Sequence, residues 1–189
     1  MRILFSVVLA ALVSLGLSAC GSTANVKLNP KIATAIPDKT SFVLKDARPD
    51  AERVSSISGG SAGETRSYGD DTLTPPVPDL LKAWLHNKLS AELAGKQVTL
   101  EQFSVSVLDP AIVIAPNTAP GTALLVKGLE SMFSQKIVYV RVGGKVGAEE
   151  FYVKESANFQ GRVAEQNVEA TLTRALDMAV EDIRRAAAK

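Results

Sequence analysis

Three segments with alternating apolar and polar residues, followed by one long helical stripe, constrain the fold of this chain more than any other feature. Residues 97–108, 135–142 and 149–159 alternate with a period of two, which is typical of strands that bury one face. Residues 168–183 instead repeat apolar side chains at helical spacing. A strand that is polar on one face buries its other face against a second layer. We therefore expect an antiparallel sheet that helices cover on one face and that solvent covers on the other.

A further strand and a further helix complete the expected fold. Residues 41–46 form a short apolar strand that ends before Pro49. Asp79 is placed to cap a helix whose leucines recur on one face, namely Leu81, Leu85, Leu89 and Leu93. The glycine-rich residues 55–71 are expected to form a long, mobile loop, and residues 143–147 a hairpin turn. The prediction is an α+β domain with a mostly antiparallel four-stranded sheet, two helices packed on one face, and the element order β-α-β-β-β-α.

The first twenty residues are organised like a cleaved export signal. Arg2 precedes an apolar run from Ile3 to Leu17, which is shorter than the about 20 residues that cross a membrane as a helix. Small residues and the only cysteine then follow, in the order Leu17, Ser18, Ala19 and Cys20. We expect residues 1–19 to be a signal peptide that a signal peptidase recognises through Leu17, Ser18 and Ala19. Cys20 is expected to be acylated before cleavage and to become the first residue of the mature chain.

The segment after the cysteine predicts how the protein is attached. Residues 20–38 are polar and small, so we expect a lipidated tether, followed by a periplasmic α+β domain at residues 39–189. A weak alternation leaves open the alternative that part of the tether lies along the domain as an edge strand: Val26, Leu28 and Ile32. One acyl chain binds a membrane marginally, whereas the three that are usual in bacterial lipoproteins bind stably. Gly21 stands where an aspartate resembles an inner-membrane retention signal, so we expect the outer membrane rather than the inner one.

Charge and composition exclude several classes of function. The 21 lysines and arginines balance 20 aspartates and glutamates, so nothing predicts a nucleic-acid partner. A single cysteine excludes an internal disulfide framework and a thiolate zinc cluster, and a single histidine, His86, argues against a histidine-rich metal site. A Ser/His/Asp triad would need His86, and no serine lies in a Gly-x-Ser-x-Gly motif. We therefore expect no catalytic residues, no metal and no cofactor, and we expect that the protein is not an enzyme.

Two kinds of charged pair are expected to be structural. The neighbouring carboxylates Asp70-Asp71 and Glu149-Glu150 are expected to be solvated surface charges. Asp46 and Arg48 share a strand face, so they are expected to form a surface ion pair that contributes at most about 1 kcal/mol.

An insertion at residues 109–134 carries more apolar residues than a connection between two strands needs. Its second half has apolar side chains on one helical face, namely Leu125, Leu129, Met132 and Phe133. The favoured interpretation is that this face completes the core of the domain. The alternatives are a projecting surface that binds a partner or a membrane, and disorder.

Several short motifs together carry a resemblance to a known group of proteins. They are the lipobox at Cys20, Asp46-Ala47-Arg48-Pro49 at the end of a strand, Tyr68-Gly69-Asp70 in a glycine-rich segment, and the leucine-striped helix. The pattern resembles the small α/β envelope lipoproteins of Gram-negative bacteria, including YajG-like lipoproteins, auxiliary lipoproteins of ABC-type transport systems, and the lipopolysaccharide-assembly lipoprotein. The resemblance implies a non-catalytic periplasmic accessory with an envelope protein as partner. The alternatives are a carrier of a lipid or small hydrophobic ligand and, with less support, a hydrolase.

Overall fold

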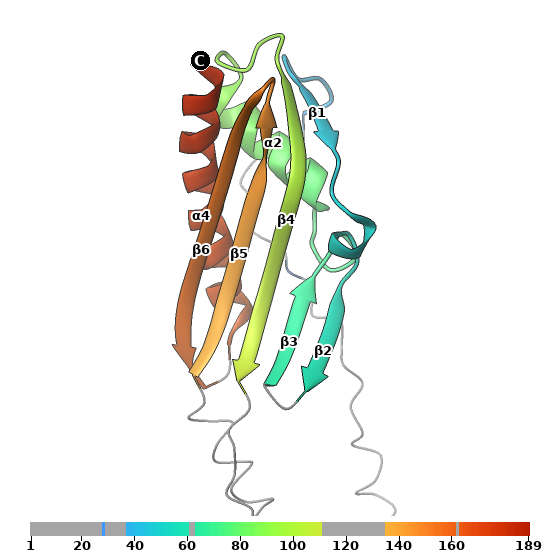
Figure 1. Ribbon diagram of the computed structural model, residues 1–189, viewed down its shortest axis with the longest axis vertical. Coiled ribbons are helices and arrows are strands. Elements are labelled where there is room, and N and C mark those ends of the chain that lie inside the picture. Colours follow the sequence, from blue (N-terminus) through green and yellow to red (C-terminus); the bar gives the residue numbers. More distant parts are fainter. Residues whose placement is uncertain (1–27, 29–36, 61–62, 111–134, 162) are drawn as a thin grey trace, which may run out of the picture.

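The protein forms one sheet with two helices packed on one of its faces (Figure 1). The computed structural model describes residues 28, 37–60, 63–110, 135–161 and 163–189. The elements in chain order are β1 (Val43–Asp46), a short 3-10 turn (Asp50–Glu52), β2 (Ser56–Gly60), β3 (Gly63–Tyr68), α2 (Val77–Leu89), β4 (Gln97–Pro110), β5 (Gln135–Val146), β6 (Glu149–Gln160) and α4 (Glu165–Ala187). The expected α+β class with a mostly antiparallel sheet is confirmed.

β4 is the strand around which the sheet is built. The order is β2-β3-β4-β5-β6, and these neighbours are antiparallel. β1 pairs in parallel with residues 97–100 of β4, whereas β3 pairs with residues 105–110. β1 and β3 therefore share one edge of β4, and β5 occupies its other edge along most of its length.

The expected count of four strands is wrong, because the sheet has six. Residues 55–71 were expected to form a loop, but they contain β2 and β3, so the element order is β-β-β-α-β-β-β-α. Their serines and glycines form no apolar alternation that would indicate strands from the sequence. They are strands because β3 pairs with the second half of β4 and β2 pairs with β3, so the tertiary setting decides their conformation.

In the hairpin between β5 and β6, the turn is shorter than expected and the paired strands are longer. The turn was predicted at residues 143–147, but β5 continues to Val146 and β6 begins at Glu149. Among the three glycines of residues 143–147, Gly147 alone, with a φ of 61°, has the left-handed conformation that favours glycine. Gly144 is instead a strand residue that lies against β4, where an added Cβ atom would be 2.0 Å from the carbonyl oxygen of Thr99.

Replacing Gly144 by alanine should therefore lower the free energy of unfolding by about 1–3 kcal/mol, because the backbone of β4 would have to move. Gly59→Ala is a matched control, since a Cβ atom on Gly59 meets nothing within 4 Å. Urea unfolding of both variants checks the prediction. Equal stability of the two variants would contradict the close approach of β5 to β4.

Both expected helices are confirmed, and they cover the same face of the sheet (Figure 1). α2 begins at Val77, before the expected cap Asp79, with Pro76 as its N-cap residue. α2 ends at Leu89, so Leu93 of the expected stripe lies in the turn that follows the helix. All four leucines are nevertheless fully buried, and so is Phe103 of β4. Helices and sheet share one apolar core, whose largest buried side chains include Leu80, Leu81, Leu85, Leu172, Leu176 and Ile183.

Leu28 belongs to this core although it precedes the strands by many residues. Its side chain is fully buried, and it forms an isolated parallel bridge with Leu73. The backbone N–H of Leu28 donates to the carbonyl of Thr72 at 2.7 Å, and the N–H of Thr74 donates to the carbonyl of Leu28 at 2.8 Å. Leu28 thus donates one hydrogen bond to the connection between β3 and α2 and accepts another from it.

Candidate functional site

The residues that were predicted to carry function lie outside the described part of the chain. They are the lipidation and cleavage residues Leu17, Ser18, Ala19 and Cys20, and the possible interaction face of Leu125, Leu129, Met132 and Phe133. Both assignments stay predictions. The structure does describe Leu28, eight residues after Cys20, and the strand residues on either side of residues 111–134.

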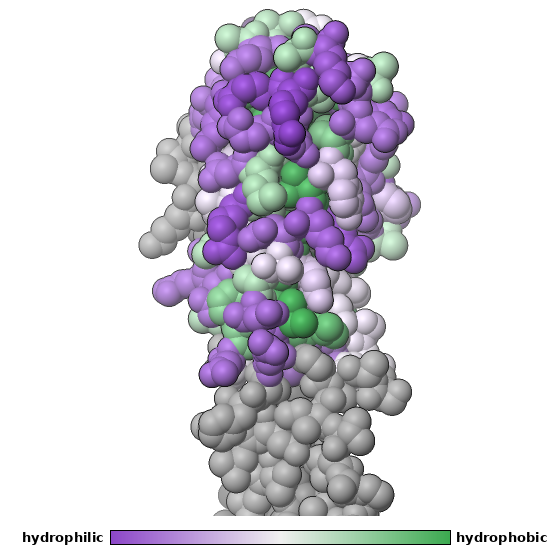
Figure 2. Space-filling model, turned by 60° about the vertical axis from the view of Figure 1, so that its left-hand side comes forward, coloured by the Kyte–Doolittle hydropathy of each residue, from purple (hydrophilic) through white to green (hydrophobic). Residues whose placement is uncertain are grey.

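A cleft of about 640 Å³ lies beside the ends of the strands that carry the insertion. It is bounded by the end of β4, the beginning of β5, β3 and the beginning of α4, on the helix side of the sheet. Its lining residues are Glu64, Arg66, Tyr68, Val107, Asp109, Lys136, Val163, Ala164, Glu165, Gln166 and Val168. Figure 2 shows hydrophobic and hydrophilic residues side by side at the lower end of the described surface. Asp109 and Lys136, one on each side of residues 111–134, therefore line a hollow of mixed character.

The chemistry of the cleft is amphiphilic. The ammonium of Lys136 pairs with the carboxylate of Asp109 at 2.5 Å. Arg66 and Glu64 lie 3.9 Å apart on β3. Tyr68 is almost fully buried, and this burial raises the pKa of its phenol, so the ring stays neutral and adds to the apolar floor. The cleft can therefore hold an apolar group only beside charged neighbours.

A second cluster, centred on Arg48, is buried where a surface ion pair was expected. The Arg48 side chain has no exposed surface, and its guanidinium donates to Asp46 through Nε and Nη2 at 2.9 Å each. Nη2 also donates to Asp70 at 2.9 Å. Burial opposes ionisation of Asp46, but the hydrogen bonds and charge of Arg48 hold the pKa of Asp46 below its ordinary value. The pair is confirmed as a pair, and its expected surface position is wrong.

Asp70 and Asp71 are also more than solvated charges. Asp70 accepts the backbone N–H of Val77 at 3.1 Å, which satisfies one free donor at the start of α2. Asp71 accepts from the backbone N–H and the hydroxyl of Ser55. Burial by itself raises the pKa of Asp71, but the hydrogen bonds that it accepts together hold this pKa below its ordinary value. The Arg48 cluster therefore joins β1, the β3–α2 connection and α2, which is a structural role.

The single histidine of the chain, His86, lies on α2. His86 is half-buried, and its Nδ1 has no hydrogen-bond partner among the described residues. In the same part of the chain, no three His, Cys, Asp or Glu side chains are grouped so that they could hold a metal ion. None of the described helices is long and apolar enough to cross a membrane.

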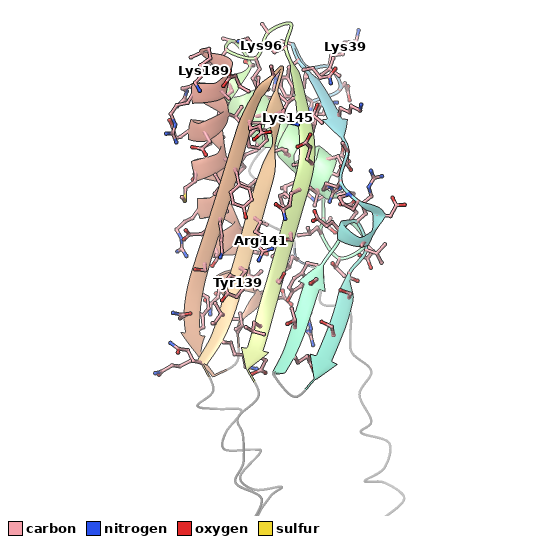
Figure 3. The ribbon with its side chains drawn as sticks, viewed as in Figure 1. Lys39, Lys96, Tyr139, Arg141, Lys145 and Lys189 are labelled. Atoms are coloured by element: carbon pink, nitrogen blue, oxygen red, sulfur yellow. The ribbon has the colours of Figure 1, made fainter. Side chains whose placement is uncertain are left out.

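The open face of the sheet, opposite the helices, carries a third feature that the sequence alone did not single out. Figure 3 shows Tyr139, Arg141 and Lys145 along β5 on this face. The register of the hairpin places Arg141 directly opposite Lys154 of β6. The polarity of this face was expected, but the cross-strand partners follow only when the turn is placed at Gly147 rather than at residues 143–147.

No protein-family model, curated protein or solved structure matches the chain.

Proposed function

We propose that the protein is a lipid-anchored, non-catalytic accessory of the bacterial envelope, attached to the outer membrane and facing the periplasm. The observation that carries this proposal is the burial of Leu28 only eight residues after Cys20. An acylated Cys20 would thus be joined almost directly to the folded core. The residues around Cys20 supply the chemistry of attachment, and Leu28 supplies its mechanical link to the domain.

The short link sets how far the domain can stand from the membrane. Eight residues span at most about 29 Å when fully extended, because an extended chain advances by at most 3.6 Å per residue. The point of the domain around Leu28 is therefore kept near the lipid surface. An accessory that is tethered in this way meets partners beside its own membrane.

The cleft at the foot of β4 and β5 is the proposed contact region for an envelope protein partner. It lies at the base of the apolar insertion, and both of its charged pairs can orient a polar partner around an apolar contact. A carrier of small hydrophobic ligands would need an enclosed apolar pocket. The charges of Lys136, Asp109 and Arg66 along this open cleft therefore favour protein contact over a carrier role.

The proposal predicts a specific defect in processing. Cys20→Ser should leave the chain as a 189-residue precursor, because the only thiol on which the lipid can be built is removed. The unchanged protein should be shortened by the 19 residues of the predicted signal peptide. Gel mobility and mass measurement of membrane fractions check the result. Ser22→Ala is the matched control and should be processed normally, whereas normal shortening of Cys20→Ser would contradict the proposal.

A further inference from the structure

Two cations face each other on the open side of the sheet. Arg141 of β5 and Lys154 of β6 are register partners on adjacent antiparallel strands, and both side chains are exposed. Like charges that are directly opposite on one sheet face destabilise the pairing. Arg141 forms no hydrogen bond or ion pair with any described residue. Lys154 has only a ring contact, with its ammonium 5.8 Å from the centre of the Tyr139 ring.

The nearby acids do not compensate this pair, because other cations engage them. Glu101 and Glu150 both lie near Lys145, at 3.2 and 3.8 Å. Glu155 follows Lys154 along β6, but it pairs with Arg174 of α4 on the helix side of the sheet, at 3.0 Å. The positive charge of the Arg141–Lys154 pair is therefore available to an external anion.

The surroundings of the pair can accommodate such an anion. Ser104 lies opposite Arg141 on the β4 side, and Ser106, Tyr139 and Ser156 form the neighbouring row across the three strands. Their hydroxyl groups are hydrogen-bond donors. The ring of Tyr152 lies against Gly143, since a Cβ atom on that glycine would be 3.0 Å from the ring, and Tyr152 is 54% exposed. Cations, hydroxyls and two tyrosine rings thus share one face.

We propose that this face binds the phosphate groups of anionic phospholipids, with Arg141 and Lys154 contacting the headgroups. The inference rests on the proposed lipid anchor, which keeps the domain within reach of a bilayer and raises the effective concentration of its headgroups. A sheet face that carries its cations on adjacent strands suits an extended anionic surface. Tyrosine rings are enriched where one end of a side chain is apolar and the other is wet, as at a membrane surface. The complementary charge and the tyrosines therefore favour the bilayer as the occupant.

The test uses the mature acylated protein on phosphatidylcholine vesicles with and without about 30% phosphatidylglycerol, which supplies the negative surface charge. Asn158→Cys, on the same face as Lys154, carries a fluorescent label, and headgroup-attached quenchers report contact. We expect stronger quenching on the anionic vesicles, and loss of this difference at high salt. Each cation near such a surface strengthens binding about fivefold, so Arg141→Gln with Lys154→Gln should weaken the contact roughly 25-fold. Equal quenching on both vesicle types, or quenching unchanged by the double substitution, would overturn the proposal.

Two controls separate headgroup binding from a general effect of charge and from a structural role of Arg141. Lys39→Gln with Lys82→Gln removes the same charge at one end of the sheet and on α2, and it should leave the quenching unchanged. Arg141→Gln alone should keep or raise the unfolding midpoint, because it removes the repulsion, whereas a purely structural role would lower the midpoint. Protein that stays on the vesicles without quenching refutes the docking face alone. If the protein purified from membranes has no acyl chains and does not stay on the vesicles, that result refutes the lipid anchor itself.

Discussion

Leu176→Ala should lower the free energy of unfolding by about 2–5 kcal/mol, which is the usual cost of truncating a fully packed leucine. Leu176 is 1% exposed on α4, and this helix packs against β5 and β6. Its removal would leave a cavity between the helix and the sheet, where the rest of the core is already buried. Chemical denaturation of the purified protein, followed by circular dichroism, measures the loss.

Met178→Ala on the same helix is the matched control. Met178 is 46% exposed, so its truncation should change stability by no more than about 0.5 kcal/mol. The contrast between the two variants tests whether α4 buries the face that the sequence predicts. Similar midpoints for both variants would contradict a core shared by α4 and the sheet.

Arg48→Met should destabilise the domain by about 3 kcal/mol, because it leaves two carboxylates without their common partner in a poorly solvated position. The side chains of Asp46 and Asp70 are only 18% and 27% exposed, and Arg48 itself has no exposed surface. Methionine keeps much of the length of the side chain, so the change removes charge and hydrogen bonds more than volume. Arg174→Met on α4 is the control, since the Arg174 side chain is 54% exposed and the loss of its ion pair with Glu155 should cost at most about 1 kcal/mol.

The effect of Arg48→Met should also depend on pH. Folding lowers the pKa of Asp46 below its ordinary value near 3.8, so the stability gained from this group is complete above that value. It is lost as the pH falls through the lower, folded-state pKa, where the carboxylate becomes protonated. The difference between the unchanged protein and Arg48→Met should therefore shrink as the pH falls below about 4. A difference that is constant from pH 7 to pH 3 would contradict the ion pair.

The parts of the fold that the sequence predicts are those with a clear apolar period. Each of these elements buries one face. Apolar residues recur at a spacing of two in the strands β4, β5 and β6, and at a spacing near 3.6 in the helices α2 and α4. β2 and β3 have no such period, because serine, glycine and threonine dominate them. β3 pairs with a strand about 40 residues away, as in the register partners Tyr68 and Val105, and β2 in turn pairs with β3. A local pattern holds no information about such a pairing.

The site features were missed for a related reason. A turn centred on residues 143–147 would place Arg141 opposite Glu149, which is an ordinary pair of opposite charges. The actual turn at Gly147 places Arg141 opposite Lys154 instead, and the cationic pair appears. Likewise, the two-residue spacing of Asp46 and Arg48 predicts that they pair. It does not predict that Arg48 is buried, because the second partner of its guanidinium, Asp70, comes 22 residues later in the chain. The register and the long-range contact are properties of the assembled sheet.

The measurement that tests the lipid anchor most directly is the mass of the N-terminal peptide of the protein purified from membranes. A lipid anchor predicts a chain that begins at Cys20, with 170 residues and the added mass of acyl chains on that residue. Such a terminus, eight residues before the buried Leu28, would join the lipid to the folded core. A chain that begins at Met1, or one with an unmodified Cys20, would contradict the lipid anchor on which the proposed function depends.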